Sequence, residues 1–452
     1  MKKLLLFLSM FVCFFMEASE QPEGLGTEES PFLITTISNL VWLQENISDT
    51  NIIPSGSYFK QTQNINAVDT KNWDSGNGFL PILTNVYISI NYDGGNYCIS
   101  NLYINRPEED YIGLFGKLEN STIKNMKLYG EIKGCEFVGS IAGMIKNTTM
   151  LSNEFHGKVI GEASVGGLIG ECTIENNVID TCSVIGNISG DYSVGGLIGW
   201  NEAGMINNCF VSGKITGNDE VVGGLIGDNG YDIFKTCNIN NSYVNGEVIG
   251  KEYVGGLIGW KTSGSISNCY LKGDVSGEEY IGGLVGWNSG FIDHSYVTGT
   301  IFGVEYVGGL AGESEYGIIK NCYIVGTISG EKYVGGLVGK GHLGTINNNY
   351  VSGTISGKSS VAGIIGTDSG FVTVITNSYY NSNKYQVASA YARSEAELKQ
   401  QITFEDWDFE NVWEIKERVS FPYFRDVPIP EPIGLTILIV ALGIFSNRRK
   451  LN

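Results

Sequence analysis

The chain has 452 residues, and its 29 Lys and Arg against 48 Asp and Glu give a formal net charge of −19. This acidic balance argues against nucleic acid as a partner. Glycine supplies 62 residues, about twice its usual share, without the three-residue period that collagen requires. Apolar residues at 42% are sufficient to build a core, which excludes a disordered chain.

The N-terminus, residues 1–19, has the pattern of a secretory signal peptide. Lys2 and Lys3 precede the uncharged apolar run 4–16, and the small residues Ala18 and Ser19 follow that run. A basic start, a short apolar stretch and small residues at the cleavage point define such signals. We therefore expect the remainder of the chain to be exported.

Residues 106–380 contain one sequence unit that is repeated about ten times. The second glycine of a V-G-G-L-I-G segment, or its equivalent, recurs every 26 to 32 residues. The marker positions are Gly113, Ser140, Gly167, Gly196, Gly224, Gly256, Gly283, Gly309, Gly336 and Gly363. Each unit holds three short extended segments separated by glycines, a composition that disfavours helices. A single coil cannot bury its apolar side chains. Successive coils must therefore stack, with about 4.8 Å between equivalent strands, and we predict an all-β parallel β-solenoid.

Equivalent residues of successive units should lie on top of one another and form ladders. A leucine ladder that includes Leu257 stands directly beside an apolar ladder that includes Ile258. Strict strand alternation would expose one of the two, so we expect either a bulge at the Gly-Gly pair or a turn directly after it. A further ladder, with His294 at one position, is mostly asparagine and suits left-handed turns, although a ligand-binding role for His294 is the alternative.

Eight cysteines remain after removal of the signal peptide, and four of them share one ladder position: Cys182, Cys209, Cys269 and Cys322. Cys269 and the ladder cysteines on either side of it are two coils apart, about 9.6 Å, which exceeds the span of a disulfide. We therefore expect mostly buried free thiols. No C-x-x-C spacing occurs, which argues against a zinc site.

Acidic residues recur four or five positions before the marker glycine in eight consecutive units. One interpretation is a solvated turn that keeps the molecule soluble. The other is that Ca²⁺ bridges stacked carboxylates, with Glu252, Glu279, Glu305 and Glu331 as candidate ligands. No other cofactor is expected.

Aromatic residues recur at two places in the unit. Trp260 and Trp287 lie in adjacent units and Trp200 lies two units away, while tyrosines stand at 253, 280, 306 and 333. Stacked rings at about 5 Å can bind sugars, and Trp200, Trp260 and Trp287 are the candidate contacts. A cross-strand ladder that only stabilises the sheet is the alternative.

The V-G-G-L-I-G segment followed by N-C-Y resembles the GLUG-repeat family of secreted or surface bacterial proteins. The resemblance implies a right-handed β-helix with an adhesin-like role. Residues 20–105 resemble the family's opening cap and first coils, with a short helix around 40–43. Residues 381–427, which contain Trp407, Trp413 and Phe421, resemble its closing segment and would cover the open end of the core.

Residues 428–452 resemble the bacterial PEP-CTERM sorting signal. Pro430, Glu431 and Pro432 precede the apolar run 433–445, and the basic residues Arg448 and Arg449 follow it. The resemblance implies an exosortase-type processing enzyme as partner and a Gram-negative-type envelope or its extracellular matrix as location. An ordinary short transmembrane anchor is the alternative.

No enzyme signature emerges from the sequence. None of the three histidines is followed by glutamate, so an H-E-x-x-H zinc helix is absent, and residues 107–392 contain no arginine. We therefore expect a non-enzymatic surface or matrix protein that contacts polysaccharide or another surface. A carbohydrate-active enzyme, a lyase or hydrolase built on the same coil, is the alternative.

Overall fold

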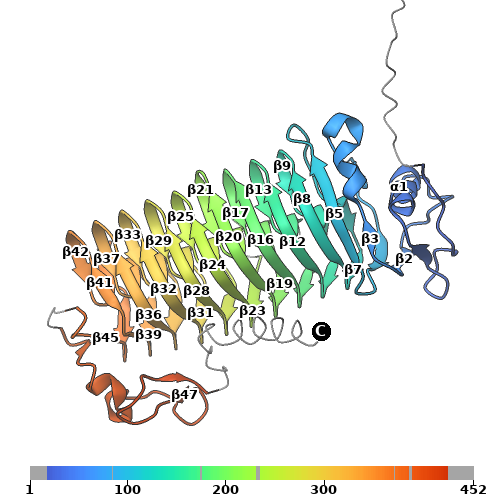
Figure 1. Cartoon of the computed structure of the whole chain (residues 1–452). Helices are drawn as coiled ribbons and strands as arrows, with labels where there is room; N and C mark the ends of the chain where they lie inside the picture. The colour runs from blue at the N-terminus through green and yellow to red at the C-terminus, as the bar shows by residue number, and fades with distance from the viewer. Residues whose placement is uncertain are drawn as a thin grey trace, which may run out of the picture. The chain divides into compact units, whose positions relative to one another are not determined.

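A computed structural model describes residues 18–83, 85–173, 176–230, 235–370, 372–385 and 389–425. The chain divides into two compact units, Met1–Glu395 and Ala396–Asn452. The first unit is a parallel β-solenoid in which equivalent strands of successive coils lie side by side (Figure 1). Most of the expected signal peptide and the whole expected sorting signal, with Pro430, Glu431, Pro432, Arg448 and Arg449, lie outside the described residues.

The short helix that the sequence predicts lies near the start of the solenoid. Helix α1 spans Ile37–Asn46, and its N-cap Thr36 accepts a hydrogen bond from the backbone N–H of Asn39 in a capping box. The face that includes Leu40 and Leu43 is buried. Two 3-10 helices, η1 (Val68–Asn72) and η2 (Asp74–Gly76), follow among the first strands. Among the described residues no helix is long and apolar enough to cross a membrane.

Four parallel sheets run along the solenoid, and we name them A to D. Sheet A has 13 strands. They are β1 (Phe32–Ile34), β2 (Ser57–Gln61), β4 (Ile90–Asp93), β7 (Thr122–Lys124), β11 (Thr149–Leu151), β15 (Val178–Asp180), β19 (Gly204–Asn207), β23 (Cys237–Asn240), β27 (Ser265–Ser267), β31 (Phe291–Asp293), β35 (Ile318–Lys320), β39 (Thr345–Asn347) and β44 (Val374–Thr376).

Sheet B has 14 strands, and these are on average the longest of the coil. They are β3 (Ile65–Asn66), β5 (Cys98–Asn105), β8 (Lys127–Lys133), β12 (Glu154–Ile160), β16 (Ser183–Gly190), β20 (Phe210–Gly217), β24 (Tyr243–Ile249), β28 (Tyr270–Ser276), β32 (Tyr296–Phe302), β36 (Tyr323–Ser329), β40 (Tyr350–Val351), β41 (Thr354–Ser356), β45 (Tyr379–Asn381) and β46 (Ala392–Arg393).

Sheets C and D hold the two strands that flank the Gly-Gly segment. The ten strands of sheet C are β6 (Phe115–Glu119), β10 (Ala142–Lys146), β14 (Ile169–Thr173), β18 (Ile198–Asn201), β22 (Ile226–Asn229), β26 (Ile258–Lys261), β30 (Val285–Asn288), β34 (Ala311–Glu315), β38 (Val338–His342) and β43 (Ile365–Asp368). The nine strands of sheet D are β9 (Glu136–Val138), β13 (Ala163–Gly166), β17 (Tyr192–Gly195), β21 (Glu220–Gly223), β25 (Glu252–Gly255), β29 (Glu279–Gly282), β33 (Glu305–Gly308), β37 (Lys332–Gly335) and β42 (Ser359–Ala362).

Each full coil runs through sheets D, C, A and B in turn, and every strand pairs in parallel with its equivalent in the next coil. The all-β parallel solenoid predicted from the repeat is therefore confirmed. The repeat count of ten underestimates the length of the stack, because sheet A also recruits β1, β2 and β4 from the N-terminal segment.

The chain bends between sheets D and C, which explains how two adjacent apolar ladders are both buried. Strand β25 ends at Gly255 and β26 begins at Ile258, with Gly256 and Leu257 in the bend. Leu257 and Ile258 are both fully buried. Of the two expected geometries, the structure shows the turn directly after the Gly-Gly pair. The change of chain direction there lets two consecutive side chains point into the same core.

The asparagine and cysteine ladders follow their predicted geometry. Asn208, His294 and the other residues of that ladder have φ between 45° and 55°, the left-handed turn that asparagine tolerates. His294 Nδ1 lies 2.7 Å from the Asp293 carboxylate at this turn. The cysteines at 182, 209, 269 and 322 are buried, and all eight described cysteines are free thiols.

The second unit has little regular structure within its described residues, 396–425. It contains the 3-10 helices η3 (Glu397–Lys399) and η4 (Gln401–Thr403) and the antiparallel pair β47 (Trp413–Glu414) and β48 (Tyr423–Phe424). The Trp407 and Trp413 rings lie 4.5 Å apart, and Phe424 lies 4.6 Å from Trp413. These aromatic residues form a cluster within the unit; their covering of the solenoid end stays a prediction.

Candidate functional site

Glycines bring sheets D and C into close contact. A Cβ on Gly286 of β30 would lie 2.5 Å from the carbonyl carbon of Tyr253 in β25. The same approach recurs one coil later, where a Cβ on Gly312 would lie 2.3 Å from the carbonyl carbon of Tyr280. Only glycine fits at such an approach, and the residue that follows it therefore lies beside the tyrosines of sheet D.

The tyrosines of sheet D form a stack that we call the tyrosine ladder: Tyr253, Tyr280, Tyr306 and Tyr333. Each has φ between 51° and 57°, an unusual backbone for a bulky residue, and each is skipped in the strand pairing. Successive rings lie 4.8 to 4.9 Å apart and are tilted by no more than 10°. The same left-handed residue in each coil thus presents every ring in the same orientation.

The residues that follow the third glycine of each V-G-G-L-I-G segment form the tryptophan ladder on sheet C. Strand pairing places them in register in this order: Lys117, Met144, Glu171, Trp200, Asp228, Trp260, Trp287, Glu313, Lys340, Thr367. The Trp260 and Trp287 rings stack at 4.4 Å and 17°. Trp200 stands on the same ladder, with Asp228 between it and Trp260. The three tryptophans therefore share one ladder, as predicted.

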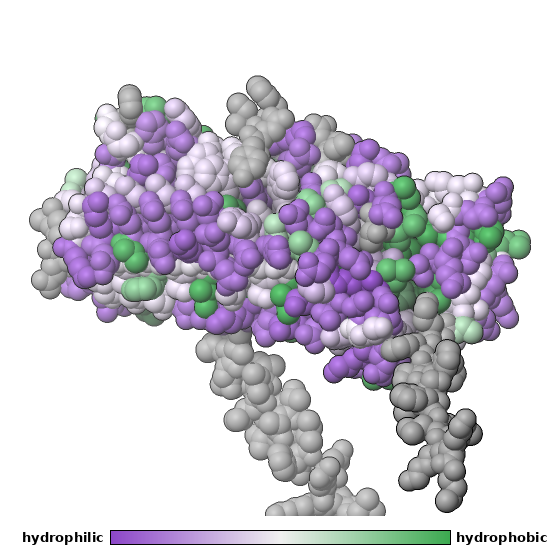
Figure 2. Space-filling model, turned by 90° about the horizontal axis from the view of Figure 1, so that it is seen from above, coloured by the Kyte–Doolittle hydropathy of each residue, from purple (hydrophilic) through white to green (hydrophobic). Residues whose placement is uncertain are grey.

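The two ladders touch, and together they define what we call the outer aromatic face. The Tyr253 and Trp260 rings meet edge to face at 4.6 Å. The Nζ atom of Lys340 lies 5.7 Å from the Tyr280 ring centre and 5.4 Å from that of Tyr306. Seen from above, on the side of sheet D, the molecule is covered mostly by hydrophilic residues with scattered hydrophobic ones (Figure 2).

Carboxylates lie within the outer aromatic face. Glu171 is 8% exposed, and its burial, together with the charge of Glu202, raises its pKa to about 7 against the opposing effect of Lys117. Glu313 is also 8% exposed and lies 2.9 Å from the Nζ atom of Lys340. The pKa of Tyr280 is raised by burial and then by the charges of Glu279 and Glu313. The face is therefore both aromatic and negatively charged.

The acidic residues before the marker glycine lie on two neighbouring ladders, not on one. Glu252, Glu279 and Glu305 pair with one another in register, but the next residue on that ladder is Lys332. Glu331 precedes it on the neighbouring ladder and pairs with Lys358. Lys332 lies 3.0 Å from Glu305. Within the described ranges, no three His, Cys, Asp or Glu side chains come together as a metal site.

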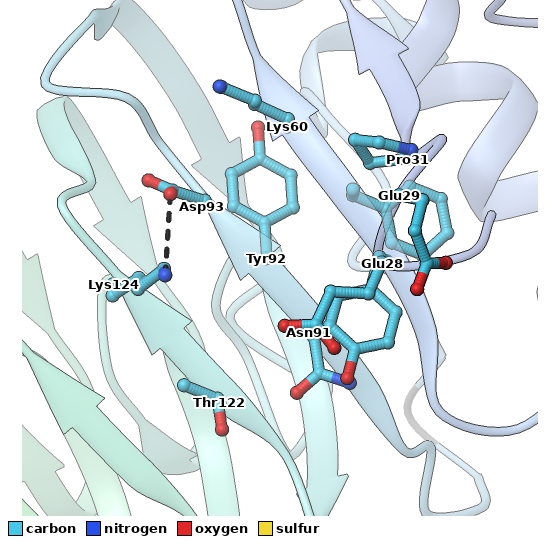
Figure 3. Close-up of a pocket in the computed structure, with 11 residues that line it drawn as sticks. Glu28, Glu29, Pro31, Lys60, Asn91, Tyr92, Asp93, Thr122 and Lys124 are labelled. Carbon is cyan, nitrogen blue, oxygen red and sulfur yellow. Dashed lines mark ion pairs between the residues drawn. The ribbon is translucent and has the colours of Figure 1, made fainter. Parts of the chain in front are cut away.

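A separate cleft of about 490 Å³ opens on the first coils of sheet A (Figure 3). Its lining includes Lys60 of β2, Asp93 of β4 and Lys124 of β7, together with Glu28 and Glu29 from the preceding segment. The Asp93 carboxylate lies 3.5 Å from Lys124 Nζ. Burial would raise the pKa of Asp93, but hydrogen bonds from Asn125 and Gly95 together with Lys124 hold it below its ordinary value. The charges in this cleft largely compensate one another.

Sequence reasoning identified the tryptophans but missed the carboxylates that share their ladder. Glu171, Asp228 and Glu313 occupy the same motif position as Trp260, directly after the third glycine. The third glycine always lies three residues after the marker, so comparing the residue that follows it across the aligned units would have revealed the mixed ladder.

A family model matches part of the repeat region. The model of the GLUG motif matches residues 190–216, 250–276, 277–301 and 303–329. The chain therefore carries GLUG repeats within a parallel β-solenoid.

Two sequence relatives share part of the repeat region. Halomucin of Haloquadratum walsbyi is 34% identical over 215 residues, which cover 45% of this chain and 2% of halomucin. A protein described as a candidate Gly-rich membrane protein of Evansella cellulosilytica is 32% identical over 154 residues, which cover 31% of this chain and 17% of the relative. The chain thus spans only a small part of the length of these relatives.

Among solved structures, a candidate immunoglobulin A1 protease from Bacteroides ovatus is similar with a TM-score of 0.38 and 17% identity. The similarity covers 89% of this chain and 94% of that one.

Proposed function

We propose that this chain is an exported protein of the bacterial surface or extracellular matrix that contacts polysaccharide through the outer aromatic face and catalyses no reaction. One observation carries the proposal: two touching ladders of rings repeat along the solenoid. Planar rings offer an apolar surface to the C–H faces of sugar rings, while flanking polar groups can bind hydroxyls. The repetition suits a polymer better than a small ligand.

The location rests on the N-terminal pattern and on the relatives. The basic and apolar start of the sequence has the pattern of an export signal. The names of the two relatives, a halomucin and a Gly-rich membrane protein, support a role at or outside the membrane. A PEP-CTERM-like tail processed by an exosortase-type enzyme in a Gram-negative-type envelope belongs to the same proposal.

Co-sedimentation of the purified full chain with insoluble polysaccharides tests this function. Trp260→Ala combined with Trp287→Ala removes the stacked pair from the face, and binding should weaken by about tenfold or more, since two large rings lose their contacts. Tyr243→Ala combined with Tyr270→Ala removes a stacked pair from sheet B and is the matched control. Equal loss in both variants would contradict the proposed face.

The same incubation separates a binder from an enzyme. Soluble sugar released over time by the unmodified chain would favour a carbohydrate-active enzyme, the alternative that the solenoid architecture leaves open. Retention of the chain on the polymer without product release is the result that the proposal predicts.

A further inference from the structure

The cleft on the first coils of sheet A uses no residue of the outer aromatic face. Its floor consists of two rows of side chains that strand pairing across β2, β4 and β7 places in register. The rows are Tyr58, Asn91 and Thr122, and Lys60, Asp93 and Lys124. Phe59 and Tyr92, which lie between the rows, are each 1% exposed and belong to the core, so both rows face outward.

Several polar groups of this cleft have no partner in the part of the chain that the structure describes. They are the hydroxyls of Tyr58 and Thr122 and the ammonium group of Lys60. Asn91 donates through Nδ2 to the carbonyl of Gly56 at 2.9 Å, which leaves its Oδ1 atom as an acceptor. The cleft thus offers a ligand a mixed set of groups that can both donate and accept hydrogen bonds.

Charges of both signs line the cleft and nearly cancel. Figure 3 shows Glu28 and Glu29 on one side of the cleft. On the other side, Asp93 forms an ion pair of 3.5 Å with Lys124. Together with Lys60, three carboxylates face two ammonium groups. A strongly charged ligand would be attracted by one set and repelled by the other, so the electrostatics favour a ligand without net charge.

We propose that this cleft is a second ligand site, which binds a short segment of a neutral sugar chain. The Tyr58 ring provides a flat surface for the C–H face of one sugar ring. Lys60 and Thr122 donate to sugar hydroxyls, and Asn91 Oδ1 accepts from one. The volume of about 490 Å³ lies within the range of small-ligand pockets, so the site holds a few sugar units and not a long stretch of polymer. The inference goes beyond the proposed function, since the two sites share no residue.

The later coils of sheet A contain a similar ion pair in different surroundings. Asp293 lies 3.3 Å from Lys320 on the ladder that contains Asp93. The neighbouring row there holds the apolar side chains of Phe291 and Ile318. The Lys320 Nζ atom lies 5.0 Å from the centre of the Phe291 ring. The polar neighbouring row therefore distinguishes the cleft from this later pair, and Lys320 is a matched control for Lys60.

Isothermal titration of the full chain with cellohexaose, maltohexaose and laminarihexaose tests the inference. At least one of these neutral hexamers should bind, and it should bind more tightly than oligogalacturonate or glucosamine oligomers of the same length. Binding of the charged oligomers alone would overturn the neutral ligand class. Failure of all three neutral hexamers to bind at millimolar concentration would overturn the site.

Two variants test whether the binding takes place in the cleft. Tyr58→Phe removes only a hydroxyl that no described residue uses, and Lys60→Met removes an exposed amine, so neither should change the melting midpoint. Each should weaken binding of the neutral hexamer about tenfold, because one hydrogen bond to the ligand is lost. Lys320→Met removes the same charge from the same sheet and should leave the affinity unchanged. Equal losses in Lys60→Met and Lys320→Met would overturn the assignment to the cleft.

The double variant Trp260→Ala with Trp287→Ala separates this inference from the proposed function. We expect it to weaken co-sedimentation with the long polymer and to leave the affinity for the hexamer unchanged. Loss of hexamer binding in this variant would place the hexamer on the outer aromatic face, which overturns the inference and supports the proposed function. Unchanged co-sedimentation, with hexamer binding still weakened by Tyr58→Phe, would overturn the proposed face and support the inference.

Discussion

The tyrosine ladder on sheet D and an aromatic stack on sheet B run along the solenoid in the same way but differ in what surrounds them. Their ring spacings are similar: the Tyr253 and Tyr280 rings of the tyrosine ladder lie 4.8 Å apart, and the Tyr243 and Tyr270 rings of the sheet B stack lie 4.7 Å apart. Burial raises the pKa of Tyr270 to about 12, with Tyr243 as the other contributor. The pKa of Tyr253 is raised by burial and also by the charge of Glu252. Stacking therefore follows from the repeat, whereas binding chemistry depends on the neighbours.

The largest expected effect comes from adding a methyl group at a glycine where sheets C and D are in close contact. Gly286→Ala would place a Cβ 2.5 Å from backbone of Tyr253, so the free energy of unfolding should fall by about 3 kcal/mol. Gly370→Ala is the control, because no atom lies within 4 Å of its added Cβ and only its φ of +91° resists alanine. Its cost should be about 1 kcal/mol by urea denaturation. Equal costs would refute the close approach.

The interior behind sheet C contains a lysine, in contrast to the apolar interior of sheet B. Lys261 is fully buried between Asn229 and Asn288, donates to the carbonyl of Gly264, and has its pKa lowered by burial to about 7. The native state releases this proton near pH 7, but the unfolded state keeps it to about pH 10.4, so this group raises stability as pH rises above 7. Lys261→Met should stabilise by about 2 kcal/mol at pH 6 and by less at pH 9.

Urea denaturation of both proteins at the two pH values measures this difference, and effects of other titrating groups cancel in the comparison. An identical difference at pH 6 and pH 9 would show that the amine keeps its ordinary pKa.

A smaller effect on the free energy of unfolding is expected from replacing Glu171 of the outer aromatic face, compared with Glu131 of sheet B. Burial raises the pKa of Glu171 to about 7, so the native state holds a proton that the unfolded state has lost, and stability falls as pH rises from 4.5 to 7. Glu171→Gln should therefore stabilise by about 1–2 kcal/mol at pH 7 and have little effect at pH 4. Glu131→Gln, on the exposed side of sheet B, is the control in thermal unfolding, and a profile that matches that of Glu171→Gln would rule out a special environment for Glu171.

The smallest expected effect concerns calcium. The carboxylates Glu305 and Glu331 already pair with Lys332 and Lys358, so the melting midpoint should be the same in millimolar Ca²⁺ and in chelator. A midpoint that rises with Ca²⁺ would instead support bridging of Glu252, Glu279 and Glu305 and would turn the acidic ladder into a second functional feature of sheet D.

The sequence predicts the fold because the repeat forces equivalent residues into register. Once Trp260 and Trp287 are known to occupy one motif position, their stacking follows from the spacing of strands. The left-handed turns at the asparagine ladder and the buried thiols follow for the same reason.

What the sequence does not reveal is contact between different positions of the unit. The bend at Gly256 and Leu257 and the approach of Gly286 to Tyr253 depend on how one sheet packs on another, for which a repeat gives no distance. The sequence places the acidic residues four or five positions before the marker glycine but does not show that this one-residue difference separates two ladders. Glu331 therefore belongs to a different ladder from Glu305.

Hydroxyl-radical footprinting of the full chain, with and without a soluble oligomer of the polysaccharide with which it co-sediments, tests the central claim most directly. The account predicts that the oligomer protects Tyr253, Tyr280 and Trp260, while Tyr243 and Tyr270 on sheet B oxidise at unchanged rates. Protection of the sheet B tyrosines alone, or equal protection of both stacks, would contradict it.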